Sequence, residues 1–113
     1  MNVKTQRIAS NIVKEISYIL AVEIKDSDIK FVTVTDCKLT TDLSFAKIYV
    51  TVLDETKKES TLKALIDARH YIRRELADRI DIRHIPELEF IYDESIEYGK
   101  KIEDIIEKIH EDN

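Results

Sequence analysis

The hydrophobic positions near the N-terminus repeat with a helical period. Between residues 3 and about 22, Ile8, Ile12, Ile16 and Ile19 recur at intervals of three or four, and polar or charged residues fill most of the positions between them. An apolar stripe with this spacing is typical of an amphipathic helix that packs one face on a core. We therefore predict a first helix over residues 3–22.

An alternating pattern replaces the helical one in the next part of the chain. Residues 29–39 are rich in Val, Thr and Phe, and residues 43–53 alternate apolar and polar side chains. Period two is the pattern of a strand with one buried face. The turn-forming residues Thr40, Thr41 and Asp42 lie between the two segments, so we predict an antiparallel hairpin.

Residues 60–84 show helical spacing again, but arginines interrupt it. One straight helix with a stripe through Leu62, Ile66 and Leu76 would place Arg69 and Arg73 in the middle of a buried face. Burying unpaired guanidinium groups costs too much free energy. Either the helix axis bends near Ala68, or the buried stripe rotates to residues Leu65, Ala68, Ile72 and Leu76.

We interpret this segment as two consecutive helices that meet at residues 68–70, with Ser60 or Thr61 as the N-cap. Both alternatives leave Arg69, Arg73 and Arg74 on one accessible surface. Arginines also occur beside a core simply because their apolar stems pack against it. On composition alone, this structural role has about half the weight and a binding role the other half.

The C-terminal part predicts one more strand and one more helix. Pro86 opens a strand in which Leu88 and Phe90 alternate with acidic residues. The apolar positions of the last helix are Ile102, Ile105, Ile106 and Ile109. The predicted fold is therefore α+β, with the order α-β-β-α-α-β, a three-stranded sheet with helices on one face, and a C-terminal helix. We expect one domain over residues 1–95, followed by an acidic amphipathic helix or tail over residues 96–113.

Composition agrees with a soluble globular chain. Of the 113 residues, 43% are hydrophobic and 36% are charged, which is enough for a single core. The apolar runs are too short to span a bilayer, and the first residues lack the core of a signal peptide, so we expect a cytoplasmic protein without membrane contact. Cys37 is the only cysteine, which excludes an intrachain disulfide. We read it as a packed small side chain, with a catalytic thiol as a remote alternative.

Charge is distributed unevenly along the chain. The net charge is -5, but residues 1–86 hold 15 Lys/Arg against 13 Asp/Glu, whereas residues 87–113 hold 3 against 10. The acidic balance therefore belongs to the C-terminal part, and the rest of the chain is able to present a local cationic patch.

No arrangement of residues predicts an enzyme. The three histidines are too scattered for a metal motif, and one glycine in the whole chain excludes a glycine-rich phosphate loop. Asp36 and Asp42 flank the hairpin turn, where stabilising the turn is a much more common role than binding a metal. We predict no catalytic residue, no metal and no cofactor.

Three blocks, in order, resemble the bacterial ribosome-binding factor A family. They are VTVTDCKLTTDLSFAKIYVTVL at residues 32–53, ARHYIRREL at residues 68–76 and RHIPELEFIYDESIEYGKKI at residues 83–102. The resemblance covers almost the whole chain and implies a type II KH-like fold. In this family a helix-kink-helix marked Ala-x-Gly replaces the usual Gly-x-x-Gly loop. Here the motif falls on Ala68, Arg69 and His70, with histidine in place of the family's glycine.

The resemblance also implies a function. Members of the family bind the free small ribosomal subunit and its ribosomal RNA and assist late maturation, without catalysis. By this analogy we expect a monomer that contacts RNA with few base-specific interactions. The candidate RNA-binding residues are Lys4, Arg7, Ala68, Arg69, His70, Arg73, Arg74 and Arg83. The alternative function is a protein-interaction module that uses the C-terminal acidic amphipathic helix.

Overall fold

The computed structural model describes residues 3–29 and 31–95 of the chain. It contains two α-helices, three strands and two short helical turns among these residues. In chain order they are α1 (Val3–Tyr18), a π-helical turn (Ile19–Glu23), β1 (Val32–Leu39), β2 (Phe45–Val52), a 3-10 turn (Glu55–Lys57), α2 (Lys58–Arg79) and β3 (Glu87–Tyr92).

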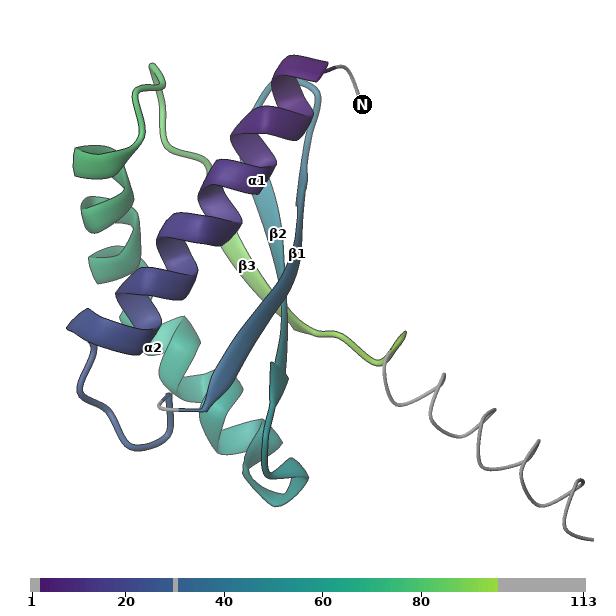
Figure 1. Ribbon diagram of the computed structural model, residues 1–113, viewed down its shortest axis with the longest axis vertical. Helices are drawn as coiled ribbons and strands as arrows, with labels where there is room; N and C mark the ends of the chain where they lie inside the picture. The colour runs from purple at the N-terminus through teal and green to yellow at the C-terminus, as the bar shows by residue number, and fades with distance from the viewer. Residues whose placement is uncertain (1–2, 30, 96–113) are drawn as a thin grey trace, which may run out of the picture.

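The three strands form one mixed sheet in the order β1-β2-β3. β1 and β2 pair antiparallel, with Leu39 opposite Ala46, as the predicted hairpin requires. β2 and β3 pair parallel, with Phe45 opposite Glu87. Parallel neighbours need a crossover connection, and α2 provides it. Figure 1 shows both helices on one side of the sheet, so the other face of the sheet carries no helix among the described residues.

The core lies between this sheet and the two helices. α1 contributes Ile12 and Ile16, the strands contribute Ile48 and Val50, and all four are fully buried. The alternation predicted for residues 43–53 is therefore real, because even-numbered residues of β2 from Ala46 onward point toward the helices. The α+β class, the three-stranded sheet and the helices on one face are confirmed. The C-terminal helix predicted over residues 96–113 lies outside the described residues.

The prediction of two helices between residues 60 and 84 is wrong. α2 runs without interruption through Ala68, Arg69 and His70, and residues 80–86 contain no helix. The buried stripe is the rotated one, because Leu65, Ile72 and Leu76 are fully buried while Ala68 packs against the core. The axis of α2 nevertheless changes direction along its length in Figure 1. His70 does not have a positive φ angle, so the bend occurs within a continuous right-handed helix and needs no glycine-like backbone.

Replacing His70 with glycine should therefore destabilise the protein. His70 is exposed and lies in the middle of α2, where glycine costs about 0.5–1 kcal/mol of folding free energy because its unfolded backbone is freer. Urea denaturation of the His70→Gly variant measures this loss. The control is His70→Ala, which should keep or raise stability. A gain in stability with glycine would show that position 70 does not have helical backbone angles.

Neither Ser60 nor Thr61 caps α2, so that prediction is also wrong. The Asp54 side chain instead accepts a hydrogen bond from the backbone N–H of Thr56 at 3.0 Å and caps the 3-10 turn that leads into α2. The Thr61 hydroxyl donates to the carbonyl oxygen of Asp28 at 2.8 Å and is buried. Thr61 therefore joins α2 to the loop after α1, a contact that local sequence does not reveal.

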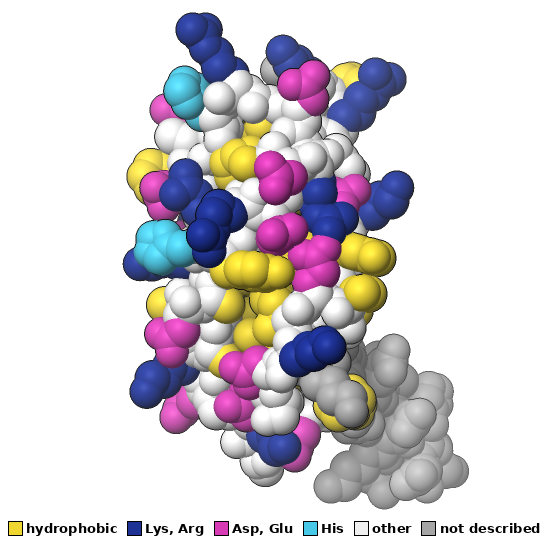
Figure 2. All heavy atoms as spheres, turned by 90° about the vertical axis from the view of Figure 1, so that its left-hand side faces the viewer, with side chains coloured by type: hydrophobic (Ala, Val, Ile, Leu, Met, Phe, Trp, Pro, Cys, Tyr) yellow, Lys and Arg dark blue, Asp and Glu magenta, His cyan; other side chains and the backbone are white. Residues whose placement is uncertain are grey.

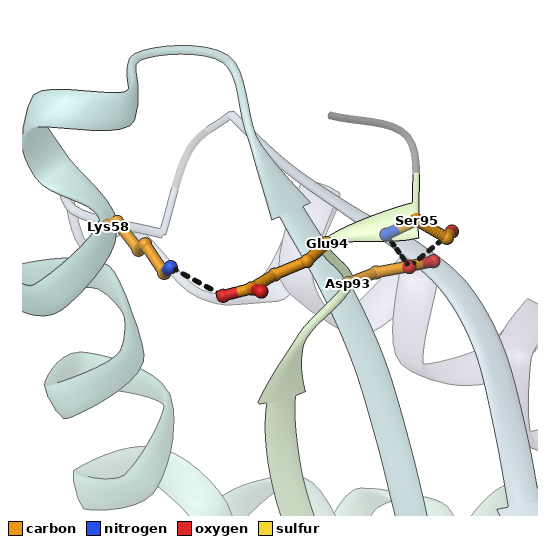
Figure 3. Close-up of polar contacts among 4 residues, drawn as sticks. All are labelled: Lys58, Asp93, Glu94 and Ser95. Carbon is orange, nitrogen blue, oxygen red and sulfur yellow. Dashed lines mark hydrogen bonds and ion pairs between the residues drawn. The ribbon is translucent and has the colours of Figure 1, made fainter. Parts of the chain in front are cut away.

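The end of β3 is attached to both other strands of the sheet and to α2. The Asp93 N–H donates to the Val50 carbonyl at 2.8 Å, and its carboxylate accepts from the hydroxyls of Ser95 and Thr35. These hydrogen bonds, above all that from Ser95, lower the pKa of the Asp93 carboxyl group. Figure 3 shows Lys58 extending from the first turn of α2 to Glu94, with 3.3 Å between Nζ and Oε1. The described chain thus ends in a region fixed to the fold.

Candidate nucleic-acid interface

The outer surface of α2 carries exposed cationic and polar side chains. Arg69, His70 and Arg74 are all exposed, and no ion pair involves them within the described part of the chain. Figure 2 shows the face formed by the helices, with several Lys, Arg and His side chains toward its left-hand margin, interspersed with acidic ones. α2 positions these side chains because its opposite face is held in the core by Leu65 and Ile72.

Arg73 differs from its two neighbours, contrary to the expectation of one accessible surface for all three. Its Nε donates to the Pro86 carbonyl at 3.1 Å, and its Nη2 donates to the Ile85 carbonyl at 2.9 Å. Its Nη1 forms an ion pair with Glu87 Oε1 at 3.2 Å. All the guanidinium nitrogens are therefore directed at the segment that starts β3. Of the three arginines, Arg69 and Arg74 are the ones available to a ligand.

Two grooves lie beside β3, and Phe45 borders both. The first groove has Ile66 and Arg69 of α2 on one wall and Leu88 of β3 on the other. The second extends from Phe45 to Arg83 in the loop after α2. Their volumes, about 630 and 580 Å³, are in the range of ligand sites, roughly 300–1,000 Å³.

The remaining predicted residues differ in whether they line the two grooves. Arg83 and His84 are exposed and line the second groove. Lys4 and Arg7 are exposed on α1 but line neither groove. In Figure 1 the start of α1, the β1–β2 turn and the loop after α2 all lie at the upper end of the molecule. Ala68 is half-buried and packs against the core, so its small side chain serves the packing of α2.

Sequence reasoning missed Phe45. An aromatic residue at the start of a strand is usually read as a core residue, yet Phe45 is 55% exposed. The period-two pattern contained the signal, because Ala46, Ile48 and Val50 occupy the buried face and therefore place position 45 on the opposite face.

The described residues contain no cluster of His, Cys, Asp and Glu that is suited to a metal ion. The Cys37 thiol is buried beneath α1, and burial together with the nearby Asp36 carboxylate raises its pKa to about 12. A thiol of this kind stays protonated at neutral pH and is a poor nucleophile, so it acts as a packed side chain. No helix among the described residues has the length and apolar character needed to cross a membrane.

The fold and the surface together define the class of the protein. It is a small α+β binding domain with exposed arginines on one helix and grooves beside that helix. Comparison with known proteins gives the family. The sequence model of the family described as Ribosome-binding factor A matches residues 4–106. The chain belongs to this family.

Relatives match over nearly the full length. Ribosome-binding factor A of Staphylococcus epidermidis is 45% identical, with 99% of this chain and 97% of that protein covered. The protein of the same name from Macrococcus caseolyticus is 42% identical, with 99% of each chain covered.

Solved structures of the family share the fold. The crystal structure of ribosome-binding factor A from Thermus thermophilus superposes with a TM-score of 0.73 and 25% identity, covering 78% of this chain and 93% of that one. A Thermus thermophilus homology model fitted into the electron-microscopy map of a 30S complex gives a TM-score of 0.68 and 24% identity, covering 80% and 96%.

Proposed function

We propose that this protein binds the free small ribosomal subunit through its ribosomal RNA and assists late maturation of that RNA without catalysing a reaction. The observation that carries the proposal is the exposed pair Arg69 and Arg74 on α2, without ion-pair partners among the described residues. Arg69 also lines the groove that α2 forms with β3. Family membership supports it, and a structural relative has been fitted into the map of a 30S complex.

The chemistry of these side chains suits RNA. A guanidinium group forms charge-assisted hydrogen bonds to phosphate oxygens and stacks on exposed bases. Contacts to phosphates do not depend on the base sequence. Single-stranded and irregular RNA segments offer both features. The protein would therefore recognise RNA shape and unpaired nucleotides and would discriminate weakly between base sequences. We also propose that it acts as a monomer in the cytoplasm, where ribosomes assemble.

The alternative function, a protein-interaction module, depends on residues 96–113. That segment lies outside the described residues, so no structural observation favours this alternative. The exposed Arg69 and Arg74 of α2 lie within the described domain and support the first proposal.

Co-sedimentation tests the proposed function. The full chain, mixed with purified small subunits, large subunits or joined ribosomes, should pellet with free small subunits. Binding should weaken steeply as salt rises, with a log-log slope of roughly 0.7–0.9 per neutralised phosphate. Equal binding to large and small subunits, or binding that salt does not affect, would count against a specific RNA interaction on the small subunit.

A further inference from the structure

Phe45 is an exposed aromatic ring at the point where the two grooves meet. It is 55% exposed and stands on the face of the sheet opposite the core, at the start of the central strand β2. The ring borders the groove that contains Arg69 and also the groove that contains Arg83. A ligand that covered Phe45 would therefore have an exposed arginine in each adjoining groove.

Hydrogen bonds fix the backbone of Phe45 to the β1–β2 turn and the turn to β3. Its N–H donates to the Thr40 hydroxyl oxygen at 3.1 Å, and its carbonyl accepts from the Thr40 N–H at 3.0 Å. The Asp42 carboxylate accepts from the Ser44 hydroxyl and N–H and from the Thr40 hydroxyl, and these bonds lower the pKa of Asp42. The Ser44 carbonyl in turn accepts from the Glu87 N–H at 2.9 Å, which attaches the turn to β3.

The same turn contains a strained residue. Leu43 has a φ angle of 64°, the only positive value among the described residues other than glycine. A left-handed backbone costs about 1 kcal/mol or more for a residue with a Cβ atom and persists where surrounding contacts impose it. The hydrogen bonds of the turn thus stabilise the backbone conformation that presents Phe45 to solvent.

The grooves beside Phe45 are lined by three acidic residues and three arginines, so pairing between these charges decides which cations are available to a ligand. Glu87 and Glu89 lie on the same face of the sheet. Arg73 forms an ion pair with Glu87, and Lys47 lies directly opposite Glu89 in the sheet. Both carboxylates therefore have a cation beside them. The Asp42 carboxylate, at the edge of the second groove, accepts its hydrogen bonds within its own turn. Arg69 and Arg83 have no ion pair in the described chain, so these two cations are available to phosphate groups.

We propose that an unpaired nucleotide of the bound RNA stacks its base on the ring of Phe45, with the flanking phosphates contacting Arg69 and Arg83. This inference depends on the proposed RNA-binding function and assigns to it a base-stacking position. An aromatic ring between two cations fits a single-stranded nucleic acid, in which bases and phosphates alternate. A base inside a duplex presents no free face, so the site selects an unpaired nucleotide.

The test uses a ten-nucleotide single-stranded RNA with a central 2-aminopurine, whose fluorescence changes when it stacks. Titration with the wild-type full chain should change the fluorescence, and the same strand annealed into a duplex should not respond. Phe45→Leu keeps an apolar side chain but removes the ring, so affinity should fall about 5- to 100-fold. Phe45→Tyr keeps the ring and should stay within about twofold of wild type.

Phe31 provides the matched control. It is 60% exposed, borders neither groove and precedes β1, away from Phe45 along the sheet. Phe31→Leu should bind the RNA as wild type does, and melting curves should show that the variants remain folded. Equal losses in Phe31→Leu and Phe45→Leu, unchanged binding in Phe45→Leu, or no fluorescence change with wild-type protein would each overturn the proposal.

A second measurement separates this proposal from the proposed function and from a protein partner. A photoreactive benzoylphenylalanine at position 45, irradiated in the complex with small subunits, should crosslink to ribosomal RNA. Crosslinking to a ribosomal protein alone would overturn the stacking proposal in favour of a protein contact. Normal co-sedimentation of Phe45→Leu with small subunits, together with unchanged RNA binding, would refute the stacking position and leave the proposed function intact. Failure of the wild-type chain to co-sediment would refute both.

Discussion

Replacing Arg73 with glutamine should destabilise the fold by about 2 kcal/mol, because hydrogen bonds to a charged group contribute roughly 1.5–3 kcal/mol and part of this is lost to solvent screening at a site of this exposure. The Arg73 side chain is 29% exposed and contacts Ile85, Pro86 and Glu87. For a domain near this size, the corresponding fall in melting temperature is roughly 10 °C.

Thermal melting and urea denaturation measure the loss, and amide hydrogen exchange locates it. The Glu87 N–H donates to Ser44 at the start of β3, so its protection should fall most in the variant. Arg73→Lys should recover only part of the stability, because an ammonium group is able to pair with Glu87 but lacks the planar fork that contacts both carbonyls. Arg74→Gln, at an exposed neighbour, should change stability by less than about 0.5 kcal/mol. An Arg73→Gln variant as stable as wild type would show that these contacts contribute nothing.

This expectation changes how binding data should be read. A variant that removes Arg69, Arg73 and Arg74 together would lose both a fold contact and two available cations. Weak binding by such a variant would not distinguish a damaged β3 from a missing phosphate contact. Arg73 therefore has to be kept when the interface is tested.

The second large effect concerns binding. The double variant Arg69→Gln, Arg74→Gln should bind small subunits roughly 10- to 100-fold more weakly, if each guanidinium makes one charge-assisted contact to phosphate. Its salt dependence should flatten by about 0.7–0.9 in log-log slope for each contact removed. Glutamine has nearly the helix propensity of arginine, so α2 should stay folded. Co-sedimentation or fluorescence titration at several salt concentrations measures both quantities.

The matched control removes the same amount of charge elsewhere. Lys25 and Lys57 are exposed, and neither borders the grooves beside β3. The double variant Lys25→Gln, Lys57→Gln lowers the net charge by the same amount as the arginine double variant. If overall charge alone caused the loss of affinity for small subunits, the loss would be equal in the two double variants. Normal binding by the arginine double variant at every salt concentration would show that α2 is not part of the interface. The description of the fold would not change.

The two arginine experiments also address how α2 combines two roles. Its buried stripe and Arg73 fix the crossover between β2 and β3, while Arg69, His70 and Arg74 face outward. Because adjacent residues of a helix point about 100° apart, neighbours in sequence are able to serve structure and binding separately. A cationic cluster in the sequence is therefore not equivalent to a cationic surface in the fold.

The sequence by itself determined the elements whose signal is local. The stripe through Ile12 and Ile16 predicted α1, and the alternation around Ile48 predicted β2, since burial of one face imposes these periods. The cost of burying guanidinium groups left two alternatives, a bent axis or a rotated stripe, and the stripe through Leu65 and Ile72 is the one that is buried. Within the described residues, the order of helices and strands followed from these patterns, apart from the division of α2 into two helices.

Only the tertiary structure decided the contacts between distant segments. The guanidinium of Arg73 meets carbonyl groups 12 and 13 residues further along the chain, and Thr35 meets Asp93 across 58 residues. The exposed ring of Phe45 gains its two flanking grooves from α2 and the loop that follows it. Periodicity reports which face of an element is buried, but it does not report which element lies beside it. That depends on how α2 crosses the sheet, and the crossing is set by the packing of the whole core.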